Sequence, residues 1–162
     1  MRLTALRCLA LVILLHAPVA GAQVIPVTIV ELDRAVAGEV AVAFTVDHER
    51  LWCVTSWTTA TRRGGYTLVT VTGVREETSV RVEASEVDLS SVTCTRPDGT
   101  AFPTLHSHPH GTCAAFPHDI EAYAARGAEF DGVLCAPTSS VWVTRWQMLA
   151  AIRMASDGIA MK

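Results

Sequence analysis

The stretch from Leu105 to Asp119 constrains the fold of this chain more than any other part of the sequence. It reads Leu-His-Ser-His-Pro, continues through a polar loop, and ends in Phe-Pro-His-Asp at the head of a helical pattern. His106 and His108 are two residues apart, so on an extended strand both imidazoles point to the same face of a sheet. The sequence therefore predicts a strand that ends at Pro109 and presents two imidazoles on one face.

A helix is expected to begin at the end of this stretch. Pro117 suits the first helical position, and apolar residues follow with i, i+3, i+4 spacing up to Gly127, which ends the pattern. Asp119 then lies in the first helical turn, with ten residues between it and His108. The strand and the helix can thus bring two imidazoles and one carboxylate together.

Two histidines and one aspartate form a donor set that suits zinc. His106, His108 and Asp119 leave a fourth tetrahedral position open for water, which is typical of a catalytic zinc site and not of a closed structural one. A chance pair of core or surface histidines is the alternative for the His-x-His spacing alone. The sequence predicts a Zn2+ site at these three residues.

These residues resemble the JAMM (MPN+) metalloprotease motif, in which His-x-His is followed after seven residues by Ser-x-x-Asp. His106, His108 and Asp119 fall on the three metal ligands of that motif. Phe116 falls on its serine, whose hydroxyl helps to hold the oxyanion of the tetrahedral intermediate in the family. The resemblance therefore implies a metal site in which one catalytic group is replaced.

The resemblance covers about residues 30–146 and implies a fold and an activity. The fold is α/β, with a curved, mainly antiparallel sheet flanked by helices in a sandwich similar to JAMM proteins and cytidine deaminases. The activity is hydrolysis of a peptide or isopeptide bond through a metal-activated water, so the partner is a peptide or protein substrate. A zinc deaminase of similar fold is disfavoured because the chain lacks His-x-Glu paired with Pro-Cys-x-x-Cys.

Glu39 is the residue that we expect to act as the general base. Residues 26–37 fit a helix loosely, and the β-branched run 40–46 indicates a strand buried on both faces. Glu39 opens that strand, which matches the place of the catalytic glutamate in the resembling family. A solvated acid at a helix-strand junction is the alternative, and Glu31 and Glu49 are the competing glutamates.

The rest of the chain alternates strands and helices. The order of helix, antiparallel strands, helix, strands and helix indicates an α/β sandwich. The expected strands are 51–57, 66–72, 80–83, 131–137 and 141–143, with a loop at 85–91 and a final helix at 146–154.

The N-terminus is typical of a secretory signal peptide. Two arginines precede the apolar run 8–15, and small residues lead to an expected cleavage after Ala22. The remaining residues, 23–162, are expected to form a single domain. The run is too short to span a bilayer, and no later stretch is long and apolar enough. We therefore expect a secreted or periplasmic protein with no membrane span in the mature chain.

The net charge also limits the classes of partner that the protein is expected to bind. Loss of the two leader arginines leaves 11 basic and 16 acidic side chains, so the formal net charge changes from −3 to −5. An acidic domain without a basic cluster is a poor partner for nucleic acid.

Four cysteines remain after the leader and suggest two disulfides in an exported protein. They allow three pairings, which the sequence leaves open. Because Cys113 lies between His108 and Asp119, a bridge that includes it would stiffen the loop that joins the metal ligands. Cysteine as a metal ligand is the rival reading, although no Cys-x-x-Cys pair is present. The four residues are Cys53, Cys94, Cys113 and Cys135.

Two functions from different classes follow. The first is an exported zinc-dependent metallopeptidase. The alternative is a catalytically impaired, disulfide-stabilised binding domain that keeps the JAMM fold, for which Phe116 in place of the motif serine is the main argument.

Overall fold

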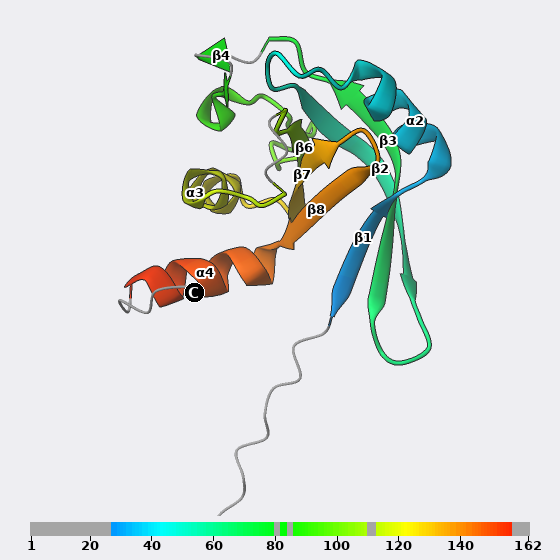
Figure 1. Ribbon diagram of the computed structural model, residues 1–162. Helices are drawn as coiled ribbons and strands as arrows, with labels where there is room; N and C mark the ends of the chain where they lie inside the picture. Colours follow the sequence, from blue (N-terminus) through cyan, green and yellow to red (C-terminus); the bar gives the residue numbers. More distant parts are fainter. Residues whose placement is uncertain (1–26, 80–81, 84–85, 110–112, 157–162) are drawn as a thin grey trace, which may run out of the picture.

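The computed structural model describes residues 27–79, 82–83, 86–109 and 113–156, and Figure 1 shows their arrangement. The predicted signal peptide, residues 1–22, and its cleavage site lie outside the described residues. The described chain forms a six-stranded sheet, a two-stranded hairpin, three α-helices and one 3-10 turn. The sheet strands are β1 (Thr28–Leu32), β2 (Leu51–Thr61), β3 (Thr67–Glu76), β6 (Thr104–Ser107), β7 (Phe130–Ala136) and β8 (Ser139–Thr144). The other elements are α2 (Arg34–Ala43), β4 (Val82–Glu83), β5 (Glu86–Val87), η2 (Leu89–Ser91), α3 (Pro117–Arg126) and α4 (Arg145–Ser156).

The six-stranded sheet is mixed and curls until it is nearly closed. Its strand order is β1-β3-β2-β6-β7-β8. The β1-β3 and β6-β7 pairs are parallel, and the other three pairs are antiparallel. The two edge strands, β1 and β8, approach each other at the opening of the curl. The α/β class and the curved sheet are as predicted.

Helices cover both faces of the sheet, with α2 on one side and α3 and α4 on the other (Figure 1). The core under α2 contains buried apolar residues from four of the six strands, including Leu105 of β6. The second core joins α3 and α4 and includes Tyr123 and Met148. Successive side chains of a strand point to opposite faces, so His106 faces the second core while Leu105 faces the first.

The secondary structure predicted from the sequence for the N-terminal part of the domain was wrong. Residues predicted as a helix contain β1, which pairs with β3, and the run from Glu39 onward, predicted as a buried strand, is largely α2. The side chain of Asp33 caps α2 by accepting a hydrogen bond of 2.8 Å from the backbone N–H of Val36. Val36 and Val40, four residues apart, form the buried stripe of this helix.

The strand and helix predicted around the histidines are present. β6 ends at Ser107, two residues before the predicted end at Pro109. α3 runs from Pro117 to Arg126, and its C-cap is Gly127, whose φ of 71° places it in the left-handed region. Phe116 at the N-cap supplies no side-chain hydrogen bond. Instead, the Asp119 carboxylate accepts a hydrogen bond of 2.6 Å from the Phe116 backbone N–H. This bond fixes the carboxylate at the first turn of α3.

Two disulfides select one of the three possible pairings. Cys53–Cys94 joins β2 to the segment that leads into β6, and Cys113–Cys135 joins the loop before α3 to β7. The predicted pair of disulfides is therefore present. Glu77 lies close to Cys53 and Cys94, and one carboxylate with two reduced cysteines could hold a metal ion. In this structure both sulfur atoms are used in the disulfide.

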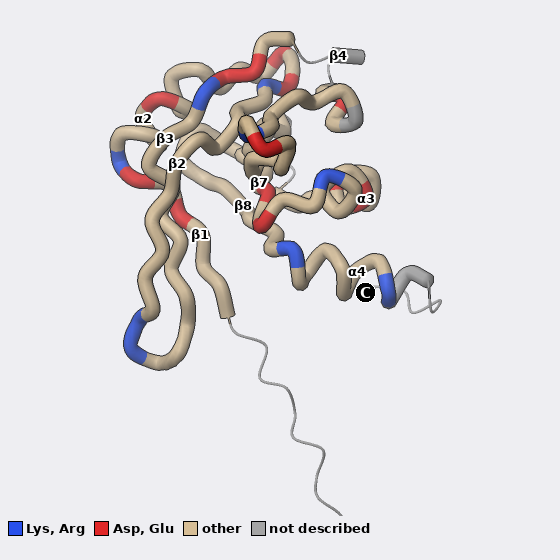
Figure 2. Tube along the Cα trace, turned by 180° about the vertical axis from the view of Figure 1, so that it is seen from behind, with Lys and Arg blue, Asp and Glu red and all other residues tan. Residues whose placement is uncertain are grey.

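Charged residues are spread over the described chain, and the adjacent pair Arg62 and Arg63 lies at the tip of the β2-β3 hairpin (Figure 2). Among the described residues, no helix is both long and apolar enough to cross a membrane.

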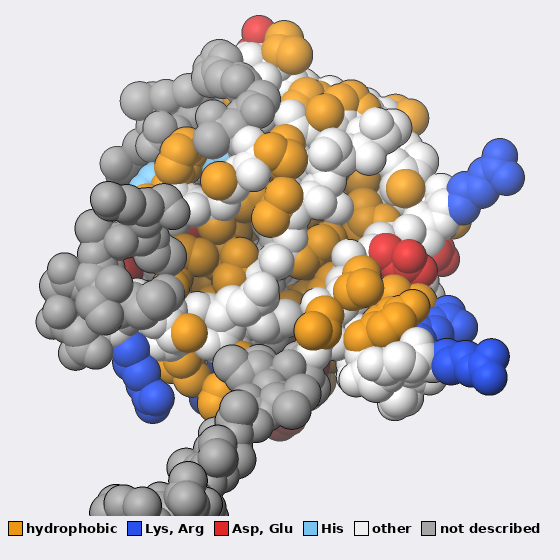
Figure 3. Space-filling model, turned by 60° about the horizontal axis from the view of Figure 1, so that its bottom comes forward, with side chains coloured by type: hydrophobic (Ala, Val, Ile, Leu, Met, Phe, Trp, Pro, Cys, Tyr) orange, Lys and Arg blue, Asp and Glu red, His pale blue; other side chains and the backbone are white. Residues whose placement is uncertain are grey.

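A cavity of about 400 Å3 opens between β1 and the β7-β8 turn. Val30, Leu32 and Leu134 contribute apolar lining, and Ser139 contributes a hydroxyl. Figure 3 shows the lower end of the molecule in Figure 1, where apolar side chains gather in a hollow.

Candidate metal centre

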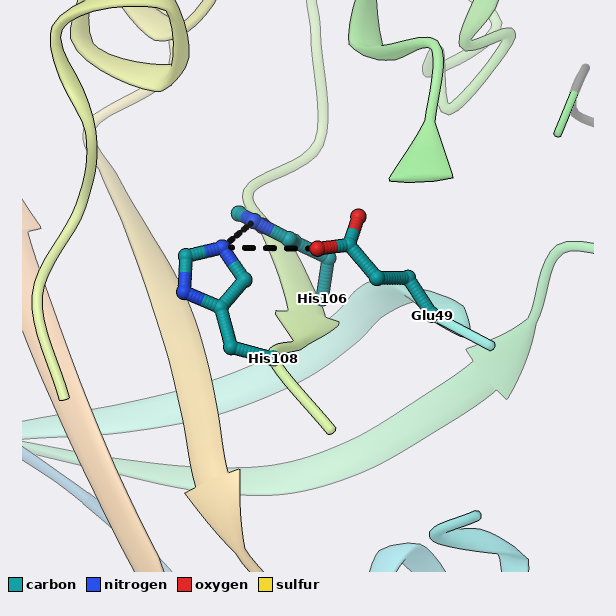
Figure 4. A group of neighbouring side chains, drawn as sticks. All are labelled: Glu49, His106 and His108. Carbon is teal, nitrogen blue, oxygen red and sulfur yellow. Dashed lines mark hydrogen bonds and ion pairs between the residues drawn. The ribbon is translucent and has the colours of Figure 1, made fainter. Parts of the chain in front are cut away.

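Four side chains from three segments converge at the end of β6. His106 Nε2 lies 2.9 Å from His108 Nε2, and Asp119 Oδ1 lies 3.5 Å from His106 Nε2. Asp119 Oδ2 and Glu49 Oε1 each lie 3.7 Å from His108 Nε2. Figure 4 shows the two imidazoles and the Glu49 carboxylate pointing toward one another. The structure therefore brings together all three predicted ligands and a glutamate.

The spacing of these donor atoms fits a metal ion. Zinc binds imidazole nitrogen and carboxylate oxygen at about 2.0–2.2 Å, so tetrahedral ligand atoms lie about 3.3 Å apart. The distances among the two imidazoles and the Asp119 carboxylate, 2.9 to 3.7 Å, bracket that value. A direct hydrogen bond between the imidazoles also explains the shortest of these distances, and each of the two carboxylates is held in place by a backbone N–H.

The centre is buried. His106 is 1% exposed, His108 4% and Asp119 2%. Burial, together with smaller contributions from the neighbouring His108 and His118, lowers the pKa of His106 to about 3. His106 is therefore neutral at physiological pH, and the neutral imidazole is the form that binds a metal.

Glu49 reaches the histidines from the turn before β2. Its Oε2 accepts a hydrogen bond of 2.9 Å from the Val87 backbone N–H, and this leaves Oε1 directed at His108. The next residue, Arg50, is held to the histidine strand, because its N–H donates to Ser107 Oγ at 2.8 Å and its carbonyl accepts from Ser107 N–H at 2.9 Å. The residue between the two histidines thus fixes the position of the glutamate.

Glu39, the expected base, lies elsewhere. It is an exposed residue of α2, and the buried residues of that helix, Val36 and Val40, belong to the core on the opposite face of the sheet from His106. The structure does not bring Glu39 to the histidines. Glu49 was one of the two competing glutamates in the sequence analysis, and only an indirect feature of the sequence could have pointed to it. β2 pairs with β6 so that Leu51 lies beside His106, and this places the residues just before β2 next to the histidines.

Phe116, at the motif-serine position, lies against the centre as a stacked ring. Its ring centroid is 4.9 Å from that of His108 with an interplanar angle of 24°, and 5.6 Å from that of His118 with an angle of 22°. Phe116 is 38% exposed. His118 is mostly exposed, and its Nε2 lies 3.3 Å from Asp119 Oδ1. Phe116 therefore covers one side of the His108 imidazole where a hydroxyl was expected.

A buried polar network supports the base of the strand that carries the histidines. Asp131 Oδ1 accepts hydrogen bonds of 2.6 Å from both the N–H and the hydroxyl of Thr104. Arg126, near the end of α3, donates to the same hydroxyl at 3.0 Å and to the Phe102 carbonyl at 2.8 Å. The network ties α3 to the start of β6 and so fixes the helix that carries Asp119.

Comparison of the chain with protein-family models, with curated proteins and with solved structures found no match.

Proposed function

We propose that the protein is an exported, zinc-dependent metallopeptidase of the JAMM type that hydrolyses a peptide or isopeptide bond. The observation that carries this proposal is the convergence of Glu49 on the buried cluster of His106, His108 and Asp119. A hydrolytic metal site needs a set of ligands and a separate acid-base group close to it. The motif provides the ligands, and the turn before β2 provides the acid-base group.

Different segments of the chain position the three proposed ligand residues. His106 lies in β6 and His108 directly follows it, and Asp119 comes from the first turn of α3, where its Oδ2 accepts a hydrogen bond from the Phe116 N–H. Two imidazoles and one carboxylate suit Zn2+ better than Mg2+ or Ca2+, which prefer oxygen ligands. When bound, zinc supplies Lewis-acid activation of a water molecule and polarisation of the scissile carbonyl.

Glu49 is the general base in this proposal and replaces Glu39. Its Oε1 accepts a proton from the attacking water as the water oxygen bonds to the carbonyl carbon. Glu49 then donates that proton to the amine nitrogen as the carbon-nitrogen bond breaks. General acid-base catalysis of this kind contributes about 100- to 10,000-fold to rate. The Val87 N–H holds the other carboxylate oxygen, so the base is oriented before substrate binds.

Export is supported by two independent features. The N-terminal sequence has the basic, apolar and small-residue regions of a signal peptide. The two disulfides are typical of proteins that fold in an oxidising compartment. The substrate is accordingly an extracytoplasmic peptide or protein.

The test compares two glutamates in one chain. Mature protein, Glu49→Gln and Glu39→Gln are each incubated with a library of fluorogenic peptides, with and without a chelator, and zinc is measured by elemental analysis. We expect about one zinc per chain in all three proteins. Chelator-sensitive hydrolysis should be lost by at least about 100-fold in Glu49→Gln and retained in Glu39→Gln.

Several outcomes would contradict the proposal. Wild-type protein that folds but takes up no zinc would remove the metal site. Equal turnover in Glu49→Gln and wild type would remove Glu49 as the base. Loss of zinc in Glu49→Gln would make it a ligand instead.

The alternative function, a catalytically impaired binding domain, is favoured by one observation. Phe116 stacks on His108 at the position where the resembling family has a hydroxyl. Zinc binding without hydrolysis across the whole peptide library would support this alternative over the peptidase.

A further inference from the structure

Helix α3 presents side chains to both nitrogens of the His106 imidazole. Asp119 and Tyr123 are four residues apart and therefore lie on the same helix face. Asp119 Oδ1 lies 3.5 Å from His106 Nε2, and the Tyr123 hydroxyl lies 2.8 Å from His106 Nδ1. One turn of helix thus reaches both nitrogen atoms of a single predicted ligand.

The Tyr123 hydroxyl has two neighbours, and one arrangement of protons lets it donate to one of them and accept from the other. Besides His106 Nδ1, the hydroxyl lies 3.3 Å from the Gly132 carbonyl oxygen of β7. A carbonyl can only accept, so the tyrosine O–H donates to Gly132 and the tyrosine oxygen accepts from an N–H at His106 Nδ1. With the proton on Nδ1, the Nε2 atom carries a lone pair.

Burial makes these hydrogen bonds necessary. Tyr123 and His106 are 0% and 1% exposed, so water does not substitute for a missing partner. The tyrosine ring packs in the core that contains Leu51 and Met148. This packing explains why an aromatic ring is present at this position, but it does not explain why the ring carries a hydroxyl. The ordinary pKa of a tyrosine, about 10, already keeps the hydroxyl protonated at neutral pH.

We propose that Tyr123 is a positioning residue of the metal centre: it holds the His106 proton on Nδ1 and keeps Nε2 open to a divalent metal ion. This inference rests on the proposed metal centre and extends it by one residue. Ligand histidines commonly donate the second ring N–H to a fixed acceptor, and loss of that acceptor typically weakens metal binding by about 10- to 100-fold.

The first measurement needs no metal. Nitrogen-15 NMR of the metal-free wild-type protein reports which ring nitrogen of His106 carries the proton. We expect the Nδ1–H tautomer in wild type and in Tyr66→Phe, the control at the other tyrosine of the chain. In Tyr123→Phe we expect a measurable population of the Nε2–H tautomer, because His106 Nε2 and His108 Nε2 lie 2.9 Å apart and a proton on either nitrogen can form the hydrogen bond between them.

The second measurement is the zinc dissociation constant, from competition with a chromogenic chelator. We expect Tyr123→Phe to bind zinc about 10- to 100-fold more weakly than wild type, and Tyr66→Phe to match wild type. A role in packing alone would lower thermal stability without changing the tautomer. The two readouts therefore separate positioning from packing.

Each outcome bears on a different claim. An Nε2–H tautomer in wild-type protein overturns the inference, even if Tyr123→Phe fails to fold. A folded Tyr123→Phe with the wild-type tautomer and wild-type zinc affinity also overturns it, and would assign the Nδ1 proton to the Gly132 carbonyl. Wild-type protein with the Nδ1–H tautomer but no zinc binding supports the hydrogen bond and contradicts the proposed function.

Discussion

Phe116 is the residue at which this site departs most from the motif that it resembles. Phe116→Ser would return a hydroxyl to the N-cap of α3, which typically stabilises a protein by about 1 kcal/mol. It would also remove the stacking on His108, and aromatic pairs contribute about 0.5–1.5 kcal/mol. These effects nearly cancel, so we expect the melting temperature and the zinc content to change little.

Turnover should respond more strongly than stability. A single oxyanion donor can contribute about 100-fold or more to rate, so we expect Phe116→Ser to raise peptide hydrolysis at least severalfold. Phe116→Ala is the control, because it removes the ring without adding a hydroxyl. A Phe116→Ser variant that is slower than wild type would show instead that the ring forms part of the substrate pocket.

Asp131 makes the stability of this fold depend on pH. Burial raises the pKa of its carboxyl from 3.8 to about 7, against the opposing effects of Arg126 and Thr104. Because the folded pKa exceeds the unfolded one, this contribution to the free energy of unfolding is complete below about pH 4 and decreases as the pH rises toward 7.

Asp131→Asn should remove that dependence. The amide oxygen can still accept both hydrogen bonds from Thr104, and an amide does not ionise. In urea denaturation between about pH 4 and pH 8, we expect wild type to lose more than about 1.4 kcal/mol relative to Asp131→Asn. The exposed Asp47, changed to Asn, is the control. A constant difference between wild type and Asp131→Asn across this range would mean that Asp131 is ionised throughout.

The residues of the candidate site were only partly predictable. His106, His108 and Asp119 were identified by their spacing along the chain, because a strand and the first turn of a helix are local structures. Glu49 was not chosen over Glu39, because its place beside the histidines depends on the pairing of β2 with β6, more than 50 residues away in sequence. The local sequence pattern around Glu49 does not determine how β2 pairs with β6.

At the level of elements, the sequence misassigned the segment before β2. The β-branched run favoured a strand at 40–46, whereas the structure has α2 up to Ala43. Alanine has the strongest helix propensity and recurs through this helix, and Asp33 caps its start. The preceding β1 was missed because its alternating pattern spans five residues, and its pairing with β3 is parallel and distant in sequence.

The two disulfides should differ in their effect on the metal centre. Cys113–Cys135 restrains the loop that joins His108 to Asp119, whereas Cys53–Cys94 restrains the segment before β6. We expect the double change Cys113→Ser with Cys135→Ser to lower both stability and zinc affinity. The change of Cys53 and Cys94 to Ser should lower stability alone.

The measurements are urea denaturation and zinc competition on both double variants. Removal of a native disulfide typically destabilises a small domain by about 2–5 kcal/mol, so experiments at low temperature keep both variants folded. Equal loss of zinc affinity in the two variants would show that the loop before α3 is held without its disulfide.

For the molecule as a whole, the class was easier to predict than the topology. The alternation of helical and strand patterns indicated an α/β fold, and the structure has one, with a six-stranded sheet. The near closure of that sheet could not be predicted from the sequence. It depends on the approach of the edge strands β1 and β8, which belong to opposite ends of the described chain. Neither edge strand carries a sequence pattern that marks it as an edge.

The disulfides close two covalent rings that follow one another along the chain and do not interlock, residues 53–94 and 113–135. Glu49 precedes the first ring, His106 and His108 lie on the tether between the rings, and Asp119 lies within the second. The oxidised unfolded chain therefore keeps both rings and still leaves the four groups of the metal centre unconnected by any crosslink. Only the fold brings these four groups together, so a metal bound at the candidate centre would be released on unfolding even while every disulfide remains intact.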